Sequence, residues 1–146
     1  MVFCFISTTV SPPALIYMGQ HQEENEKLLK EEGMENSDDL WFHVDGMSSA
    51  HVYLQMPRGM TMETITGELL EDCCQLVKKH SIQGCKLDEV QVVYTMKSNL
   101  KKTKGMASGQ VSYVGFHNPN MTKLHMTTKK NSVKILKRLM ETRWKT

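Results

Sequence analysis

The residues of this chain that are best suited to chemistry are lysines gathered just after an apolar segment. Lys101, Lys102 and Lys104 fall within four consecutive positions, and Lys97 stands at the end of the segment before them. Flexible lysines next to a glycine such as Gly105 suit contacts with phosphate groups, where charge matters more than directional geometry. The loop contains no arginine, so it lacks the forked donors that read base edges. We therefore predict a phosphate-backbone contact here, with a solvated loop as the alternative interpretation.

Three more lysines are expected to extend this contact. Lys78 and Lys79 end a predicted helix, where a cation also complements the helix dipole, and Lys86 follows shortly after them. Residues 20–40 carry a net charge of −6, from eight acids and two lysines, and residues 123–146 carry +7, from eight cations and one acid. Such segregation favours a surface that faces a polyanion, although solvated charge kept for solubility is the simpler interpretation.

His43 and His51 are the other residues that could take part in chemistry. As metal ligands they lack a third and a fourth partner at a suitable spacing. With Asp45 and either Ser48 or Ser49 they supply the residue types of a hydrolytic triad, but no nucleophile elbow or oxyanion loop surrounds them. We expect both imidazoles to fix a turn through hydrogen bonds, and we keep His43 as a candidate nucleic-acid contact on an exposed sheet face. No catalytic residue, metal site or cofactor is predicted.

The composition fits a single intracellular domain. A chain of 146 residues can bury a core without disulfides, and its apolar and charged fractions, 40% and 23%, are ordinary. Its four cysteines form no CxxC pair, which suits a reducing compartment. No segment reaches the roughly eighteen apolar residues that a membrane helix needs. We expect a cytoplasmic or nuclear location, or both, and membrane association stays open as an alternative.

The positions of the apolar residues predict an α+β fold, with an antiparallel or mixed sheet and about three packed helices. Predicted strands cover residues 2–6, 14–18, 40–44, 51–55 and 90–96, followed by a hairpin of 110–116 and 123–128. Predicted helices cover residues 23–32, 61–80 and the basic C-terminal segment. Strand alternation places Trp41 and His43 on one face of the sheet and Phe42 on the other.

The C-terminal segment is predicted to form a separate element. We divide the chain into a domain over residues 1–129 and a basic helix over 130–146, which runs to the end of the chain. The helix carries a narrow apolar stripe, formed by Val133, Leu136, Leu139 and Met140. A stripe of this width is typical of the first turns of a coiled coil. Because about two heptads are too short to associate alone, we expect self-association only through a C-terminal extension.

Eight short motifs follow one another along the chain. They are YMG at 17–19, ENE at 24–26, LWFHV at 40–44, SSAHV at 48–52, SIQGCK at 81–86, VVYT at 92–95, SNLKKT at 98–103 and GQV at 109–111. Their order resembles the NFACT-R domain family, and most closely its stand-alone eukaryotic branch. The resemblance implies a nucleic-acid-binding module, since larger relatives attach this domain to proteins that handle tRNA on stalled large ribosomal subunits.

One position departs from the pattern of that branch. Its members usually have Pro-Trp before the SNLKK run, whereas this chain has Met96 and Lys97. The change removes any stacking role of the tryptophan and adds a positive charge. It therefore predicts binding that depends more strongly on electrostatics.

Together these features predict a non-enzymatic domain that contacts the phosphate backbone of DNA, tRNA or rRNA without regard to sequence. The alternative is a protein-interaction or scaffold module, linked to ribosome quality control or to a membrane-associated partner. A third interpretation, an esterase or nuclease that uses His43, Asp45 and His51, has the least support.

Overall fold

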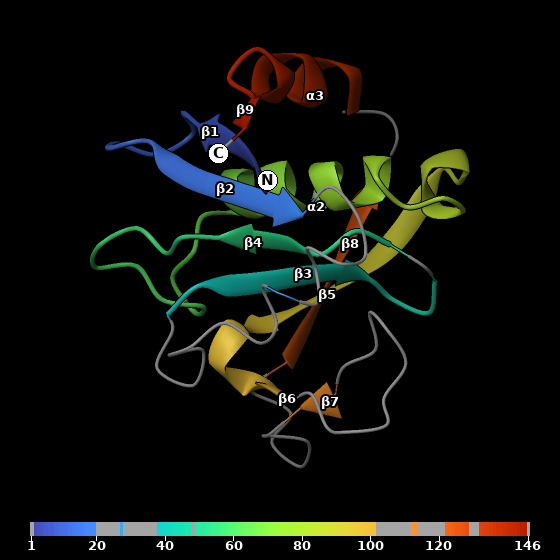
Figure 1. Ribbon diagram of the computed structural model, residues 1–146, viewed down its shortest axis with the longest axis horizontal. Helices are drawn as coiled ribbons and strands as arrows, with labels where there is room; N and C mark the ends of the chain where they lie inside the picture. Colours follow the sequence, from blue (N-terminus) through green and yellow to red (C-terminus); the bar gives the residue numbers. More distant parts are fainter. Residues whose placement is uncertain are drawn as a thin grey trace.

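A large β-sheet carries one helix across its face and a second helix at one end. The computed structural model describes residues 2–19, 27, 38–47, 49–101, 112–113, 122–128 and 132–145. In Figure 1, helix α2 (Gly67–Lys79) crosses behind the sheet, and helix α3 (Ser132–Met140) lies at the end where the first strand runs. The predicted α+β class is confirmed.

The sheet has seven strands, and every pair of neighbours is antiparallel, in the order β8–β5–β3–β4–β2–β1–β9. Its strands are β1 (Val2–Ser7), β2 (Ala14–Gly19), β3 (Leu40–Val44), β4 (Val52–Leu54), β5 (Glu89–Met96), β8 (Thr122–Thr128) and β9 (Trp144–Lys145). The first five agree with the predicted strands to within one residue at each end. Of the two predicted sheet types, the structure has the antiparallel one.

Helix α2 begins six residues later than predicted, because threonine hydroxyls end the preceding turn. Thr66 is the N-cap, and its Oγ1 accepts a hydrogen bond from the Leu69 N–H at 3.2 Å. Further upstream, the Thr61 N–H donates to Thr64 Oγ1 at 2.8 Å. Side-chain oxygens of this kind compete with helical carbonyls for backbone donors, so they favour caps and turns over a helix interior.

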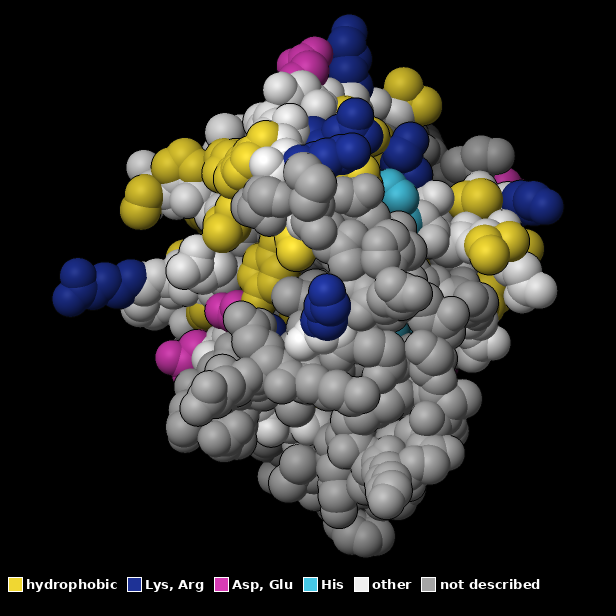
Figure 2. Space-filling view, in the orientation of Figure 1, with side chains coloured by type: hydrophobic (Ala, Val, Ile, Leu, Met, Phe, Trp, Pro, Cys, Tyr) yellow, Lys and Arg dark blue, Asp and Glu magenta, His cyan; other side chains and the backbone are white. Residues whose placement is uncertain are grey.

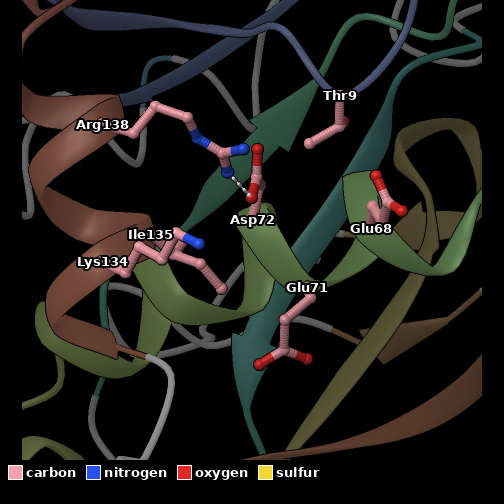
Figure 3. A pocket seen from close by; sticks show the side chains of 7 residues that line it. All are labelled: Thr9, Glu68, Glu71, Asp72, Lys134, Ile135 and Arg138. Atoms are coloured by element: carbon pink, nitrogen blue, oxygen red, sulfur yellow. Dashed lines mark hydrogen bonds and ion pairs between the residues drawn. The ribbon is translucent and has the colours of Figure 1, made fainter.

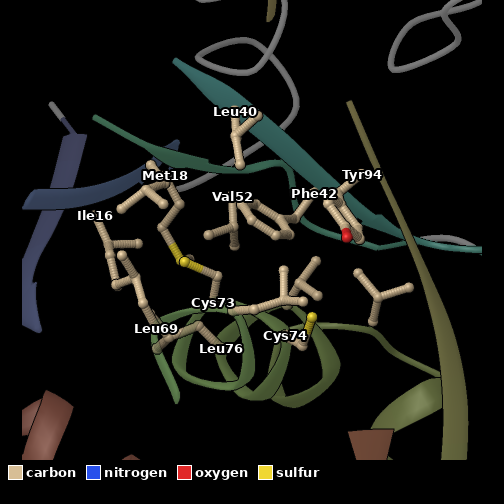
Figure 4. Packing of buried hydrophobic residues seen from close by; sticks show 14 of the residues in the cluster. Ile16, Met18, Leu40, Phe42, Val52, Leu69, Cys73, Cys74, Leu76 and Tyr94 are labelled. Atoms are coloured by element: carbon tan, nitrogen blue, oxygen red, sulfur yellow. The ribbon is translucent and has the colours of Figure 1, made fainter. Parts of the chain in front are cut away.

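Strand alternation divides the buried side chains of the sheet into two clusters, as predicted. The larger cluster lies between the sheet and α2, and Figure 4 shows Ile16, Met18, Leu40, Phe42, Val52 and Tyr94 facing Leu69, Cys73, Cys74 and Leu76 of the helix. The smaller one is on the opposite face and contains Trp41, Tyr53, Val93 and Leu100. Burying each large apolar side chain contributes about 1.5–3 kcal/mol, so the helix-covered face is the main source of stability.

The predicted hairpin of 110–116 and 123–128 is wrong in its pairing. Strand β8 pairs with β5 along seven residues, from Thr122 opposite Thr95 to Thr128 opposite Glu89. Strand β7 (Ser112–Tyr113) pairs instead with β6 (Leu100–Lys101) in a separate two-stranded sheet. The two predicted partners therefore belong to different sheets, because each finds a neighbour that is more distant in sequence.

The C-terminal helix is shorter than predicted, and the expected total of about three helices is also corrected. Helix α3 ends at Met140, and the chain returns to the sheet as β9. Thr142 explains the stop: its hydroxyl donates to the Leu139 carbonyl at 2.6 Å and accepts from the Ile6 N–H of β1 at 2.9 Å. The described residues contain two α-helices. The helix predicted over 23–32 lies outside them except for Lys27, which is helical.

Candidate nucleic-acid interface

The predicted lysine-rich loop leaves the sheet at a junction that is held by buried polar groups. Strand β5 passes into a short 3-10 turn, η3 (Lys97–Asn99), and then into β6. The Lys97 N–H donates to the Asp39 carbonyl at 2.7 Å, and Asn99 Nδ2 donates to Thr95 Oγ1 at 3.0 Å. Because these groups are buried, their hydrogen bonds fix where the following segment starts.

Lys97 itself does not lie on the surface where a phosphate contact would be made. Its side chain is 3% exposed, and its ammonium lies 5.0 Å from the ring centroid of Tyr53 and 5.7 Å from that of Tyr17. The two tyrosine rings stack at 5.0 Å, and the Tyr17 hydroxyl donates to Asp39. The aromatic faces attract the cation. The positive charge at position 97 therefore belongs to the interior, contrary to the prediction that it adds to the binding surface.

The other predicted contact residues separate into three groups. Lys78 is 3% exposed and points into the domain, so its position does not fit a surface contact. Lys79 and Lys86 are exposed, at the end of α2 and in the 3-10 turn η2 (Gly84–Lys86). The backbone of Lys101 lies in β6, whereas Lys102 and Lys104 lie outside the described residues.

The two histidines lie next to each other on the face opposite α2. Trp41 Nε1 donates to His51 Nδ1 at 3.2 Å, and the His51 side chain is buried. The His43 ring stacks on Trp41 at 5.5 Å and meets the His51 ring edge-on at 5.2 Å. The aromatic partner was not anticipated, because we expected hydroxyl and backbone groups of a turn to hold both imidazoles.

The described hydrogen bonds of His43 and Ser49 differ from those of a hydrolytic triad. His43 Nδ1 donates to the Val44 carbonyl at 2.6 Å, so its inner nitrogen does not face a carboxylate. Burial lowers the pKa of His43, while that hydrogen bond and the charge of Asp45 oppose the shift. The Ser49 hydroxyl donates to the Ala50 carbonyl at 2.7 Å, and Ser48 lies outside the described residues.

A cavity between α2 and α3 was not predicted. Its volume is about 490 Å³, and its lining consists of Thr9, Glu68, Glu71, Asp72, Lys134, Ile135 and Arg138. Figure 3 shows Arg138 reaching from α3 to the carboxylate of Asp72 on α2. Asp72 also accepts from the Ser7 hydroxyl at 2.7 Å. Burial raises the pKa of Asp72, and the hydrogen bond from Ser7 and the charge of Arg138 partly offset this.

The contacts around this cavity join structural elements. Glu71 points toward β8, where it lies 2.8 Å from His125 Nε2. Asp72 and Arg138 join the two helices. Asp72 is buried and the Arg138 side chain is 40% exposed, so the pair lies at the border of the domain interior.

Among residues 2–19, 38–47, 49–101 and the later described segments, no three His, Cys, Asp or Glu side chains lie close enough to hold a metal ion. No helix within the described part of the chain has the length and apolar character needed to cross a membrane.

Comparisons with known proteins agree on one family. Residues 1–115 match the family described as "NFACT protein RNA binding domain". The chain is 51% identical to coiled-coil domain-containing protein 25 of Danio rerio over 143 residues, 98% of this chain and 66% of that protein. It is 48% identical to a Dictyostelium discoideum homologue over 136 residues, 93% of this chain and 63% of the homologue. The chain thus spans about two thirds of the length of these curated relatives.

One solved structure has a similar fold. It is the C-terminal part of the fibronectin/fibrinogen-binding protein from Streptococcus suis, with a TM-score of 0.68 over 90% of this chain and 47% of that chain. The two sequences are 22% identical, so the likeness concerns the fold alone.

Proposed function

The chain belongs to the NFACT protein RNA binding domain family, and from this premise we propose that it binds RNA through the phosphate backbone. The single observation that carries the proposal is the family match over residues 1–115. The lysines of the β6–β7 segment supply the charge that such a contact needs. Binding is expected to be micromolar or weaker, independent of sequence and steeply dependent on salt.

The proposed contact set follows from the sequence and from the exposure of the described lysines. Lys101, Lys102 and Lys104 form the main contact, and the exposed Lys79 and Lys86 extend it. The polar junction at η3 supports this arrangement, because a loop that starts at a fixed point loses less entropy when it binds. The buried Lys78 and Lys97 belong to the framework of the domain.

The histidine cluster is assigned a structural role in this proposal. The rings of His43 and His51 contact each other, and Trp41 donates a hydrogen bond to His51, on the face opposite α2. Their hydrogen bonds to an indole and a backbone carbonyl suit a fixed framework better than proton transfer. The proposed function is accordingly non-enzymatic.

A salt-dependent binding titration tests the proposal. Fluorescence anisotropy of labelled tRNA, single-stranded DNA and duplex DNA is measured at about 50 mM and about 200 mM salt. We expect tRNA to bind at the lower salt and to be released as the salt rises. If tRNA does not bind even at about 100 μM protein and the lower salt, RNA binding is excluded, and the protein-interaction alternative becomes the better account. The two DNA arms show whether the domain distinguishes DNA from RNA.

A further inference from the structure

The edge strand β9 carries cations that are held in place by an aromatic ring. In the antiparallel register, Lys145 lies opposite Phe3 of β1, and Trp144 lies opposite Cys4. The Arg143 guanidinium and the Lys145 ammonium are each 5.2 Å from the centroid of the Phe3 ring. Such contacts restrict two long side chains that would otherwise move freely, so their charges stay at the sheet edge.

Trp144 is an exposed aromatic residue between these two cations. Its side chain is 41% exposed, whereas Trp41, the other tryptophan, is 2% exposed in the smaller buried cluster. Because successive residues of a strand point to opposite sides, the indole and Lys145 lie on opposite sides of the edge, and Arg143 lies with Lys145 at the Phe3 ring. A polymer that runs along this edge would meet a ring on one side and positive charge on the other.

Helix α3, which precedes β9 in the chain, brings more positive charge to the same region. Residues 132–145 contain five cations and one acid, Glu141. Figure 2 shows Lys and Arg side chains gathering at the top of the view, over α3 and β9.

We propose that Arg143, Trp144 and Lys145 form a second contact with single-stranded RNA. Trp144 stacks on a base, and the two flanking cations take up phosphates. Aromatic residues interleaved with positive charge are the usual means of holding a single strand without reading its sequence. The inference rests on the proposed function but adds a separate surface, since residues 143–145 lie beyond the 1–115 segment matched to the family.

Tryptophan fluorescence tests this contact, because only one of the two tryptophans is exposed. The chain is titrated with oligouridylate at low salt, and binding is followed in parallel by anisotropy of the labelled oligonucleotide. We expect the emission to be quenched as the complex forms, and the quenching to be absent in Trp144→Phe, which keeps an aromatic ring and should still fold. Trp144→Ala should weaken binding about tenfold, since one stacked base is worth roughly 1–3 kcal/mol.

Charge variants separate this surface from the rest of the molecule. Arg143→Gln combined with Lys145→Gln should lower the slope of log affinity against log salt concentration by about 1.4, because each phosphate contact contributes roughly 0.7 on a single strand. The matched control, Lys27→Gln with Arg58→Gln, removes the same charge from exposed positions outside residues 132–145 and should leave the slope unchanged. Melting curves confirm that both pairs fold.

The outcomes distinguish the two proposals. If oligouridylate binds but the emission is unchanged, or if Trp144→Phe is quenched as strongly as the parent, the β9 contact is excluded and RNA binding stands. Equal salt slopes for the two charge variants lead to the same conclusion. If oligouridylate and tRNA both fail to bind at low salt, the proposed function fails and the β9 contact fails with it.

Discussion

Lys78 and Lys79 show that two neighbouring lysines can have opposite environments. Lys78 is buried and Lys79 is exposed, because one step along a helix turns the side chain by about 100° and only one of the two positions faces the domain. Lys97 is buried for a different reason, since its ammonium lies over two stacked tyrosine rings. Charge patterning in the sequence identifies cations but does not show which of them reach solvent.

Replacing Lys97 tests its assignment to the interior. Lys97→Met keeps most of the side-chain volume and removes the ammonium over Tyr17 and Tyr53. We expect the variant to lose about 0.5–2 kcal/mol of stability, measured by urea unfolding, and to keep the salt slope of RNA binding. Lys86→Met, at an exposed position, is the control and should leave the stability unchanged within about 0.5 kcal/mol. A reduced salt slope in Lys97→Met would show that this lysine does contact RNA.

We expect two histidines to make the stability of the fold depend on pH. Burial lowers the pKa values of His43 and His80 below their ordinary value of 6.5, although hydrogen bonds to the carbonyls of Val44 and Leu76 oppose the shift. The folded chain therefore binds fewer protons than the unfolded chain in this range. Their contribution to stability is complete above pH 6.5 and is lost as the pH falls through the lowered folded values.

We predict that the melting temperature falls as the pH is lowered from about 7 to about 5, and that His43→Gln with His80→Gln flattens this dependence. Circular dichroism melting curves across the range provide the measurement. A double variant whose melting temperature drops as steeply as that of the parent would assign the pH dependence to other groups.

At the scale of the elements, local pattern located the strands but not their distant partners. The alternation of apolar residues and the β-branched residues predict the ends of strands β1 to β5 to within one residue, because each strand buries one apolar face against α2. The pairing of β8 with β5 and of β7 with β6 depends on contacts across a sheet, which periodicity does not encode. The early end of α3 depends on one threonine hydroxyl that bonds to β1.

The ion pair between Asp72 and Arg138 is predicted to hold α3 on the domain. Arg138→Met leaves the buried carboxylate with the Ser7 hydroxyl as its remaining partner in this cluster. Breaking a fully buried pair costs about 3–5 kcal/mol, but the Arg138 side chain is 40% exposed, so we expect a loss of about 1–3 kcal/mol.

Urea unfolding measures this loss. The control is Lys137→Met, on the exposed side of the same helix, which should change the stability by less than about 0.5 kcal/mol. Equal midpoints for the two variants would show that the ion pair contributes nothing to the docking of α3.

At the scale of the whole molecule, the elements next to the two proposed contacts lie far apart. In Figure 1, β6 and β7 are at one end of the molecule, and β9 and α3 are at the other. The net charge of +2 conceals this arrangement, because acidic residues offset the basic ones in the sum but are distributed differently along the chain. An RNA that bound at both ends would make two weak contacts. The first contact would raise the effective concentration of the RNA at the second, so the overall affinity would exceed that of either contact alone.

The sequence predicts the family of this chain better than it predicts which lysines are exposed. The order of the motifs indicated the family, and the match over residues 1–115 confirms it. Lys79 and Lys86 are exposed, and their contact with RNA stays a prediction, whereas the burial of Lys78 and Lys97 depends on packing that the sequence does not encode. The hydrogen bond from Trp41 to His51 was missed because it joins β3 to the residue before β4, ten positions away in the sequence. The exposed Trp144 was missed because the segment around it was expected to be helical.

The salt dependence of RNA binding tests the central claim most directly. Lys101→Ala, Lys102→Ala and Lys104→Ala are combined in one variant, and log affinity for single-stranded RNA is measured against log salt. We predict that the slope flattens by about two units, since each lost phosphate contact contributes roughly 0.7. The control variant combines Lys27→Ala, Arg58→Ala and Lys134→Ala at exposed positions and should keep the parent slope. If the two variants have the same slope, this loop is not the site where the domain contacts RNA.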